Sequence, residues 1–299
     1  MPTYALTAPK LLVLGLVSLL LAGGTACGKA NPTSLYVPPA GPVEVVVTVP
    51  VFADLVKQVG GERVRVTSVL PPGADVQQYN PSEADKAAMR NANIIFVNGQ
   101  GLESFIDSVV LRNYKQGSAI SILSGAVAVE DVAHKDKWLW LDVQNAMSYV
   151  TNIKDTLALV DPPHKSLYRQ NASAYLDKLR ALHNELKQGF ASIPESKRKL
   201  VSLRDSFRSF AQAYGFEVVG SLDAASTSGG RTALEQAIKA LQVPVLFTEP
   251  GLDRAVADSI AADTGVRVSS LYVDTLDAQV ATYEQLMRFD LKQLLEQLR

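Results

Sequence analysis

The chain has 299 residues, of which 47% are apolar and 20% are charged, a composition typical of a folded globular protein with one or two domains. Its 29 basic and 30 acidic side chains leave a net charge of −1. The protein therefore lacks a basic field for a phosphate backbone, and nucleic acid is not expected among its partners. The single cysteine excludes an internal disulfide framework and a multi-cysteine zinc site.

The N-terminus carries the pattern of an export signal. Leu11–Ala22 is a weakly polar run of 12 residues, which is too short for a membrane span of about 20 residues and suits the apolar region of a secretory signal. The following Gly23-Gly24-Thr25-Ala26-Cys27 resembles a bacterial lipoprotein box, although Gly24 stands where Leu is usual. We expect residues 1–26 to be a signal peptide and Cys27 to be lipidated. Ordinary cleavage that leaves a free thiol is the alternative.

This signal predicts an exported protein, anchored by lipid at the outer face of the cytoplasmic membrane or located in the periplasm. The segment after Cys27 is rich in Gly, Pro and Ala and shows no periodicity. Such a composition is typical of a flexible linker. Residues 27–42 are therefore predicted to be the tether between the lipid and the folded part.

From residue 43 onward, β-branched runs alternate with helix-length segments. Near-continuous apolar strands in such an alternation indicate parallel sheets covered on both faces. Four strands are expected in each half: Val43–Val49, Val64–Leu70, Asn93–Asn98 and Ala119–Leu123, then Lys199–Leu203, Phe216–Leu222, Val243–Glu249 and Arg267–Val273. The expected helices include Phe52–Gly60, Ser82–Ala92, Phe207–Tyr214, Thr232–Leu241 and Asp253–Thr264. The predicted fold class is α/β, with two doubly wound lobes that each hold a four-stranded, mostly parallel sheet.

A long helix is predicted between the two halves. Ser166–Ser192 contains no Pro and no Gly before Gly189, and its apolar residues recur at steps of three and four as one stripe. At 1.5 Å per residue, a helix of about 26 residues is about 39 Å long and can lie against both lobes. We expect an N-terminal lobe at 43–160, a spine helix at 161–193 and a C-terminal lobe at 194–299. Any ligand is expected in the cleft between the carboxyl ends of the two sheets.

Several short segments resemble the solute-binding lipoproteins of zinc and manganese ABC importers, the metal-binding cluster A-I or adhesin lipoprotein family. They follow the family's order along almost the whole mature chain: Leu70–Asp75 with Tyr79-Asn80-Pro81, Asn98–Glu103, Trp140-Leu141-Asp142 with Asn145-Ala146, Asn171–Tyr175, and Leu271–Asp274. The resemblance implies two lobes on one helical spine, zinc or manganese as cargo, and an ABC permease of the membrane as partner. A monomer is expected.

The resemblance also implies three histidines and one carboxylate around the metal, and only the carboxylate is present. The family's three histidine motifs fall on Asp75–Tyr79, Asp136–Trp140 and Leu203–Phe207. The histidine positions are then occupied by Gln77, Trp138 and Arg204. Asp274 keeps the fourth position, and Glu249 is a second acid near the same strand ends.

This exchange removes the chemistry of a zinc site. Zinc needs about four N, S or O donors at about 2 Å. Gln77 offers a neutral carbonyl, Trp138 offers no lone pair, and Arg204 brings a fixed positive charge that repels a divalent ion. We therefore expect no zinc at the family's position with the family's affinity, and no cofactor is assigned.

The three histidines of the chain do not restore the site. His134 lies four residues before the second position, so an extended loop displaces it by about 13 Å. His183 lies on the apolar stripe and is expected to be a core histidine with its hydrogen bonds satisfied. His164 is expected to be a capping or surface residue near the start of the spine.

Three occupants of the cleft stay open. In the first interpretation the Arg204 guanidinium pairs with Asp274, and with Glu249 as a further candidate, because an uncompensated buried carboxylate is costly and Arg matches carboxylates in bidentate geometry. In the second, Arg204, Trp138 and Gln77 line a pocket for a small anionic or planar organic solute. The third is residual metal binding.

The remaining motifs predict no catalysis. Gly99-Gln100-Gly101 lacks the third glycine of a dinucleotide loop, and Ser228-Gly229-Gly230-Arg231 lacks the lysine and spacing of a phosphate loop. Both are predicted to be turns. The sequence has no Gly-x-Ser-x-Gly motif, and an enzyme is not expected. The favoured function is the solute-binding component of a metal-type ABC importer with an altered site. The alternative is a non-transport lipoprotein of the cell surface, an accessory or adhesion-like module.

Overall fold

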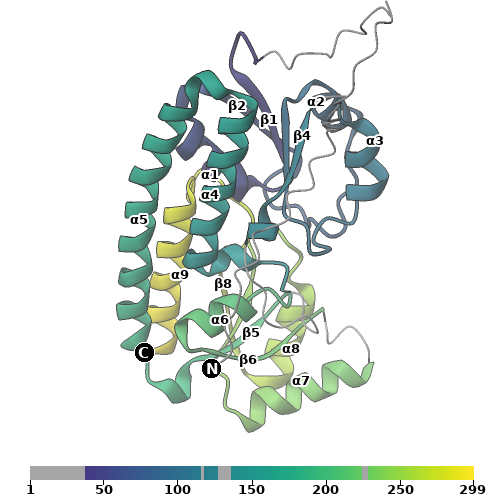
Figure 1. The fold of residues 1–299 in the computed structure, drawn as a ribbon. Coiled ribbons are helices and arrows are strands. Elements are labelled where there is room, and N and C mark those ends of the chain that lie inside the picture. Colours follow the sequence, from purple (N-terminus) through teal and green to yellow (C-terminus); the bar gives the residue numbers. More distant parts are fainter. Residues whose placement is uncertain (1–37, 116–117, 127–135, 224–227) are drawn as a thin grey trace, which may run out of the picture.

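The computed structural model describes residues 38–115, 118–126, 136–223 and 228–299. They form two α/β lobes, one above the other in Figure 1, beside a group of long helices. The predicted signal peptide, Cys27 and most of the predicted tether lie outside the described residues. In the described part of the chain, no helix is both long and apolar enough to cross a membrane.

Each lobe is built on a four-stranded parallel sheet. The strand order is β2-β1-β3-β4 in the first sheet and β6-β5-β7-β8 in the second, so the two halves repeat one topology. The strands are β1 (Val43–Val47), β2 (Val64–Ser68), β3 (Ile94–Val97), β4 (Ala119–Ile122), β5 (Lys199–Ser202), β6 (Glu217–Ser221), β7 (Val245–Thr248) and β8 (Arg267–Ser270). All eight lie inside the predicted ranges, and the expected fold class is confirmed.

Burial explains why the central strands are the most apolar. Every residue of β3 and β7 is buried, whereas β2 and β8 at the sheet edges are half-buried or exposed along their length. Helices cover both faces of such sheets, so the inner strands need apolar side chains on both sides. The sequence runs that signalled strands most clearly are accordingly the inner ones.

The helices fill the intervals between strands. They are α1 (Pro50–Gly60), α2 (Glu83–Asn91), α3 (Leu111–Asn113), α4 (Val143–Val160), α5 (Lys165–Ala191), α6 (Arg208–Tyr214), α7 (Ser228–Ala240), α8 (Ala255–Thr264) and α9 (Tyr283–Leu298). Local chemistry sets several boundaries: Pro50 begins α1, and Ser82 and Asp85 form a capping box at the start of α2.

The long helix between the halves is α5, with 27 residues. It packs against α1 of the first lobe and α6 of the second, and Figure 1 shows it running beside both lobes. The long helix predicted at Ser166–Ser192 is therefore present, shifted by one residue at each end, and lies within the expected spine segment 161–193. Figure 1 also shows α4 and α9 running along α5, and both contact it.

Three features differ from the sequence-based expectations. Neither α4 nor α9 was predicted as a separate helix, although α4 buries residues spaced as one helical stripe, from Val143 to Leu157. The predicted turn at 228–231 is the first turn of α7. Glycine disfavours helix, but Leu234 and Ile238 are buried in the core of the second lobe, and this packing outweighs the local preference.

One hydrophobic core extends through both lobes. It includes Val45 of β1 and Val245 of β7, and it continues through residues of α4, α5 and α9. Phe190 on α5 lies 5.2 Å from Phe210 on α6 between ring centroids, in edge-to-face geometry. The second lobe is thus tied to the spine by packed aromatic rings, which restricts how far the lobes can move apart.

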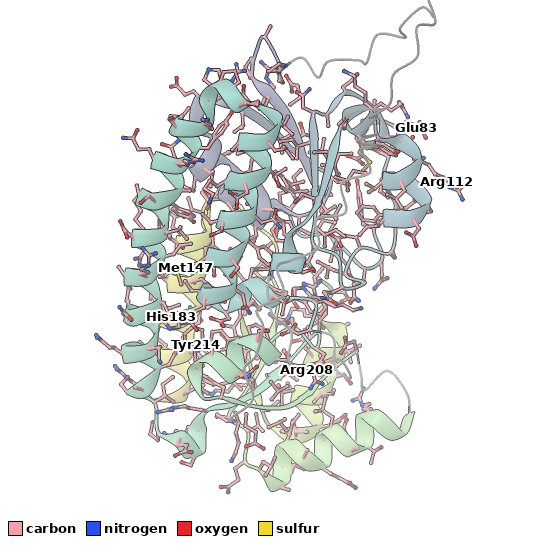
Figure 2. The ribbon with its side chains drawn as sticks, viewed as in Figure 1. Glu83, Arg112, Met147, His183, Arg208 and Tyr214 are labelled. Atoms are coloured by element: carbon pink, nitrogen blue, oxygen red, sulfur yellow. The ribbon has the colours of Figure 1, made fainter. Side chains whose placement is uncertain are left out.

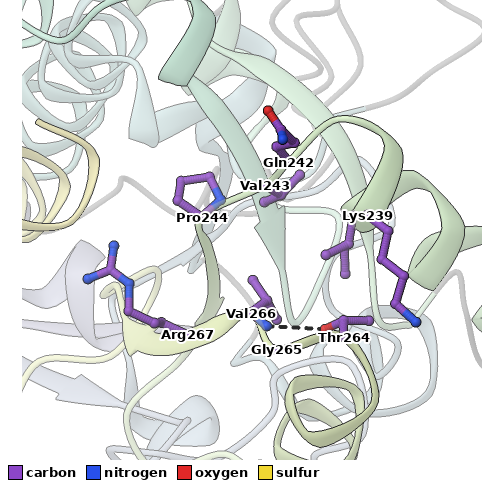
Figure 3. A pocket seen from close by; sticks show the side chains of 9 residues that line it. Lys239, Gln242, Val243, Pro244, Thr264, Gly265, Val266 and Arg267 are labelled. Atoms are coloured by element: carbon purple, nitrogen blue, oxygen red, sulfur yellow. Dashed lines mark hydrogen bonds between the residues drawn. The ribbon is translucent and has the colours of Figure 1, made fainter.

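An open hollow of about 560 Å³ lies at the amino ends of β7 and β8. Figure 3 shows Pro244, Val266 and Arg267 around it. Its Arg267 guanidinium donates to the Gln297 side chain on α9 at 2.8 Å. The hollow is at the end of the second sheet opposite the carboxyl ends, so it is separate from the predicted cleft.

Candidate functional site

Charged side chains gather where the carboxyl ends of the two sheets face each other. Asp75 follows β2 of the first sheet, whereas Arg204, Glu249 and Asp274 follow β5, β7 and β8 of the second. In parallel α/β sheets this edge is where ligands bind. Four residues that are far apart in the sequence thus meet at one point between the lobes.

The Arg204 guanidinium is the centre of this cluster. Its Nε donates to Glu249 Oε1 at 2.9 Å, and its Nη2 donates to Glu249 Oε2 and to Asp274 Oδ2 at 2.9 Å. Its Nη1 faces Asp75 Oδ1 at 3.5 Å. The side chains of Arg204, Glu249 and Asp274 are 4–5% exposed, and that of Asp75 is 21% exposed. Arg204 thus forms a bidentate pair with one acid and further ion pairs with two others.

Three carboxylates share this one cation, and the pKa values of Arg204 and Glu249 reflect that. Burial acts to lower the pKa of Arg204, but the carboxylates of Glu249 and Asp274 outweigh burial and raise it above its ordinary value. Burial raises the pKa of Glu249; Arg204 opposes the rise, while the negative charges of Asp274 and Asp75 add to it. The arrangement is therefore one that demands a positive charge at its centre, and Arg204 supplies it.

Trp138 covers the guanidinium from the side of the first lobe. The Arg204 Cζ atom lies 5.1 Å from the centroid of the indole, within the range of a cation–π contact. Trp138 is 3% exposed. The Trp138 backbone N–H donates to Asp136 Oδ1 at 2.9 Å, and Asp136 Oδ2 accepts from the Ser209 backbone in α6 at 2.6 Å. Asp136 therefore fixes the Trp138 loop to the second lobe.

Gln77 joins the cluster through its backbone. Its N–H donates to Asp75 Oδ1 at 3.0 Å, and its carbonyl accepts from Ser104 Oγ at 3.1 Å. The same Asp75 oxygen faces Arg204. Gln77 thus orients Asp75 toward the guanidinium, a role that differs from the ligand position that the resemblance gave it.

Two turns meet directly across the cleft. The Gly73 backbone N–H of the first lobe donates to Thr275 Oγ1 of the second at 2.8 Å. A Cβ atom placed on Gly251 would lie 2.4 Å from the Gly73 Cα, so only glycine allows this approach. Nearby, Trp140 Nε1 donates to the Val273 carbonyl at 2.8 Å, which adds a hydrogen bond from the first lobe to the residue before Asp274.

The structure brings Arg204, Glu249, Asp274 and Trp138 together at one point, and Arg204 forms ion pairs with Asp274 and Glu249. The sequence did not assign a role to Asp75, although this residue opens the motif at the end of the β2 segment. The position of Asp75 shortly after this predicted strand is the sequence feature that indicates a place at the cleft. The contact of Gly73 with Gly251 had no signal in a single sequence.

The histidines lie away from the cluster. His183 on α5 is buried near Tyr214 of α6, with ring centroids 5.8 Å apart, and Figure 2 labels both beside the lower half of the spine. Its Nδ1 has no hydrogen-bond partner in the described part of the chain, so the expectation of a satisfied core histidine was wrong on that point. His164 contacts Asp161 and is partly exposed, as expected. His134 lies outside the described residues.

Among residues 38–115, 118–126, 136–223 and 228–299, no three His, Cys, Asp or Glu side chains are arranged to hold a metal ion. Gly99, Gln100 and Gly101 all have positive φ, which confirms the predicted turn. Glu103 accepts backbone N–H groups of Asn98 and Gly99 next to this turn.

Two parallel sheets that face each other across buried charges, joined by one long helix, define a two-lobed solute-binding protein. The chain belongs to the ZnuA family, described as zinc-uptake complex component A, periplasmic, whose model matches residues 45–297. The resemblance seen in the sequence is thereby confirmed.

Relatives and solved structures agree with this assignment. The chain is 29% identical over 256 residues to the manganese-binding lipoprotein MntA of Halalkalibacterium halodurans, covering 82% of this chain and 85% of the relative. It is 28% identical over 304 residues to the metal ABC transporter substrate-binding lipoprotein FimA of Streptococcus parasanguinis, covering 95% and 97%.

The fold matches that of the periplasmic zinc-binding protein TroA from Treponema pallidum with a TM-score of 0.79, 24% identity, and coverage of 87% of this chain and 99% of that chain. The Mn-bound periplasmic metal-binding protein from Candidatus Liberibacter asiaticus gives a TM-score of 0.77 at 25% identity, covering 85% and 99%.

Proposed function

We propose that this chain is the solute-binding component of a zinc- or manganese-type ABC importer in which the Arg204 guanidinium takes the place of the metal cation. The observation that carries the proposal is the pairing of buried Arg204 with Glu249, Asp274 and Asp75. A cluster of acids that faces a cleft between lobes is suited to a cation, and here a side chain of the protein supplies that cation.

The donor set supports the loss of a zinc site of the family's type. The positions for which the resemblance implies histidines hold Gln77, Trp138 and Arg204. Zinc requires about four donors with free lone pairs, and the guanidinium has none. A divalent ion at this point would also meet a positive charge in a buried environment, where screening is weak.

Substrate-binding components of ABC transporters work with a membrane permease and an ATPase, and two of the relatives named above are lipoproteins. We extend this to the present chain as an exported, monomeric binding protein without enzymatic activity, anchored through lipid on Cys27 and serving a permease of the same class.

The same cluster favours a second candidate. Because the guanidinium already occupies the centre of the acids, the protein can keep the scaffold of the family without carrying a solute. It would then be an accessory or adhesion-like lipoprotein of the cell surface. Genes for a permease and an ATPase beside this gene would support transport, and an isolated gene would support the second candidate. An organic solute is less favoured, since the Trp138 ring face is occupied by Arg204.

The test is calorimetric titration of the purified protein with Zn²⁺ and Mn²⁺, together with elemental analysis. We expect no stoichiometric uptake by the natural chain. Arg204→His should bind a divalent ion measurably, because it places one imidazole among three carboxylates. Arg208→His, which changes an exposed arginine four residues further on, is the matched control and should not bind. Tight stoichiometric uptake by the natural protein would contradict the proposal.

A further inference from the structure

We propose that Arg204 is also a clasp that holds the two lobes together in the absence of any solute. The clasp consists of Arg204, Glu249 and Asp274 of the second lobe and Asp75 and Trp138 of the first. The inference rests on the proposed function only for the identity of the partner, a permease that would then always meet the closed form. The clasp itself follows from contacts between the lobes.

The guanidinium is positioned by its own lobe. Glu249 holds two of its nitrogens and Asp274 shares one of them, and all three residues follow strands of the second sheet. A planar cation fixed in this way loses little further conformational freedom when another surface closes on it. The second lobe thus presents a preformed positive group toward the first.

The first lobe supplies the two surfaces that complete the contact. Asp75 brings a carboxylate to Nη1, and Trp138 brings the face of its indole over Cζ. Trp138 Nε1 has no partner in the described part of the chain, so the indole contributes through its ring face. A carboxylate and an aromatic ring face of the first lobe therefore contact the same guanidinium of the second lobe.

Further contacts between the two lobes, at the edge of the cleft, are consistent with a closed arrangement of the lobes. The Gly73 and Gly251 turns touch backbone to backbone, and Gly73 N–H donates to Thr275 across the lobes. In the opposite direction, the Ser209 backbone N–H of the second lobe donates to Asp136 of the first. All of these contacts join protein atoms of one lobe to protein atoms of the other.

A cation that is part of the chain differs from a free cation in one respect. A free ion closes a cleft only as far as its concentration and affinity allow, whereas a tethered group acts at a high and constant effective concentration. Closure of this protein should therefore be independent of metal concentration.

The lobe-to-lobe distance can be measured with spin labels. Cysteines replace exposed Glu83 of the first lobe, labelled in Figure 2, and Lys239 of the second, labelled in Figure 3, in a full chain that carries Cys27→Ser. The natural clasp should give one distance distribution that is unchanged by ZnCl₂, MnCl₂ or EDTA. Arg204→Ala should give a broader and longer distribution. Millimolar free guanidinium should shift it back, and urea at the same concentration should not.

Two further variants keep the test independent of the folding of Arg204→Ala. Asp75→Asn removes the charge contributed by the first lobe at a partly exposed position, and it should lengthen the distance to a smaller extent. Gly251→Ala places a methyl group against Gly73 and should increase the distance between the two turns, and therefore between the two lobes. Gly265→Ala is its control, because Gly265 also has positive φ but a Cβ added there would meet open space.

Trp138 offers a second measurement, since Trp138 and Trp140 are the only two tryptophans of the chain. In a Trp140→Phe background, opening of the clasp should expose Trp138, shift its emission to longer wavelength and increase its quenching by iodide. A natural chain that shortens its spin-label distance on addition of Zn²⁺ or Mn²⁺ would overturn the clasp. So would Asp75→Asn and Gly251→Ala variants that keep the natural distribution.

The two proposals fail separately. Tight metal uptake at constant lobe distance would contradict the proposed replacement of the metal and leave the clasp standing. A lobe distance that varies freely in the natural protein without metal uptake would remove the clasp and leave the altered site.

Discussion

Two buried arginine–carboxylate clusters of this protein are built in opposite ways. At the start of the spine, the Asp161 carboxylate accepts hydrogen bonds from Arg63, Tyr168 and His164. In the cleft, Arg204 alone faces Glu249, Asp274 and Asp75. The first cluster has one acid that several donors share, and the second has one cation that three acids share.

The pKa values separate the two clusters. Burial acts to raise the pKa of Asp161, but its donors outweigh burial and lower it to about 2. The pKa of Glu249 is raised by burial and by its acidic neighbours despite Arg204. A balanced cluster stabilises the fold, whereas an excess of acid marks a place where a cation is required. The contrast supports the proposal that the cleft is a cation site in which Arg204 supplies the cation.

The largest effect is expected from removal of the cleft cation. Arg204→Ala leaves three buried or partly buried carboxylates without a counter-charge and should lower the free energy of unfolding by about 3–5 kcal/mol. Urea denaturation at neutral pH measures the change. Arg208→Ala removes an exposed arginine that pairs with Asp205, and it should cost less than about 1 kcal/mol. Equal losses of unfolding free energy in the two variants would show that the cleft carboxylates do not need Arg204 as a counter-charge.

A smaller effect is expected at the spine. Arg63→Ala leaves Asp161 with Tyr168 and His164 and should cost about 1–3 kcal/mol. Because the folded-state pKa of Asp161 is about 2, its stabilising contribution is complete above about pH 4 and is lost as the pH falls toward 2. Urea denaturation over this acidic range should show the loss at higher pH in Arg63→Ala.

The matched control for the spine is Arg65→Ala, two residues further on, which removes an exposed ion pair with Glu44. It should leave the acid dependence of stability unchanged. If Arg63→Ala also left that dependence unchanged, the ion pair with Asp161 would not be what lowers its pKa.

The smallest effect concerns a buried acid with no counter-charge. Asp290 on α9 accepts the Tyr272 N–H at 2.9 Å through Oδ1, and its Oδ2 has no partner in the described part of the chain. Burial raises the pKa of Asp290 well above its ordinary value. The folded protein thus holds a proton that the unfolded chain releases above about pH 4, so this group's contribution to the free energy of unfolding falls as the pH rises.

Asp290→Asn keeps the shape and the acceptor without the titration. The variant should therefore show a shallower decline of the free energy of unfolding between about pH 5 and pH 8, measured by urea denaturation at several pH values. Asp177→Asn on the exposed side of α5 is the control. Parallel curves for Asp290→Asn and the natural chain would show that Asp290 is ionised in the folded protein.

Much of the fold was accessible from the sequence because the inner strands and the spine are buried continuously. All eight strands and α5 follow directly from apolar runs and from one helical stripe. The helix α4 was not predicted, although its buried residues form one helical stripe. The helix α7 was shortened because Gly229 and Gly230 weaken the local signal, whereas packing of Leu234 and Ile238 decides the outcome.

The sequence alone indicates the chemistry of the cleft, because an arginine and two acids lie at the ends of three strands and parallel strands bring their carboxyl ends to one edge. The pairing across the lobes depends on the tertiary structure, since Asp75 meets Arg204 from 129 positions away and Gly73 touches Gly251. Local patterns encode the period of burial and the chemical type of a side chain. Distances between lobes arise from the packing of the common core, to which β1, β7, α4, α5 and α9 all contribute.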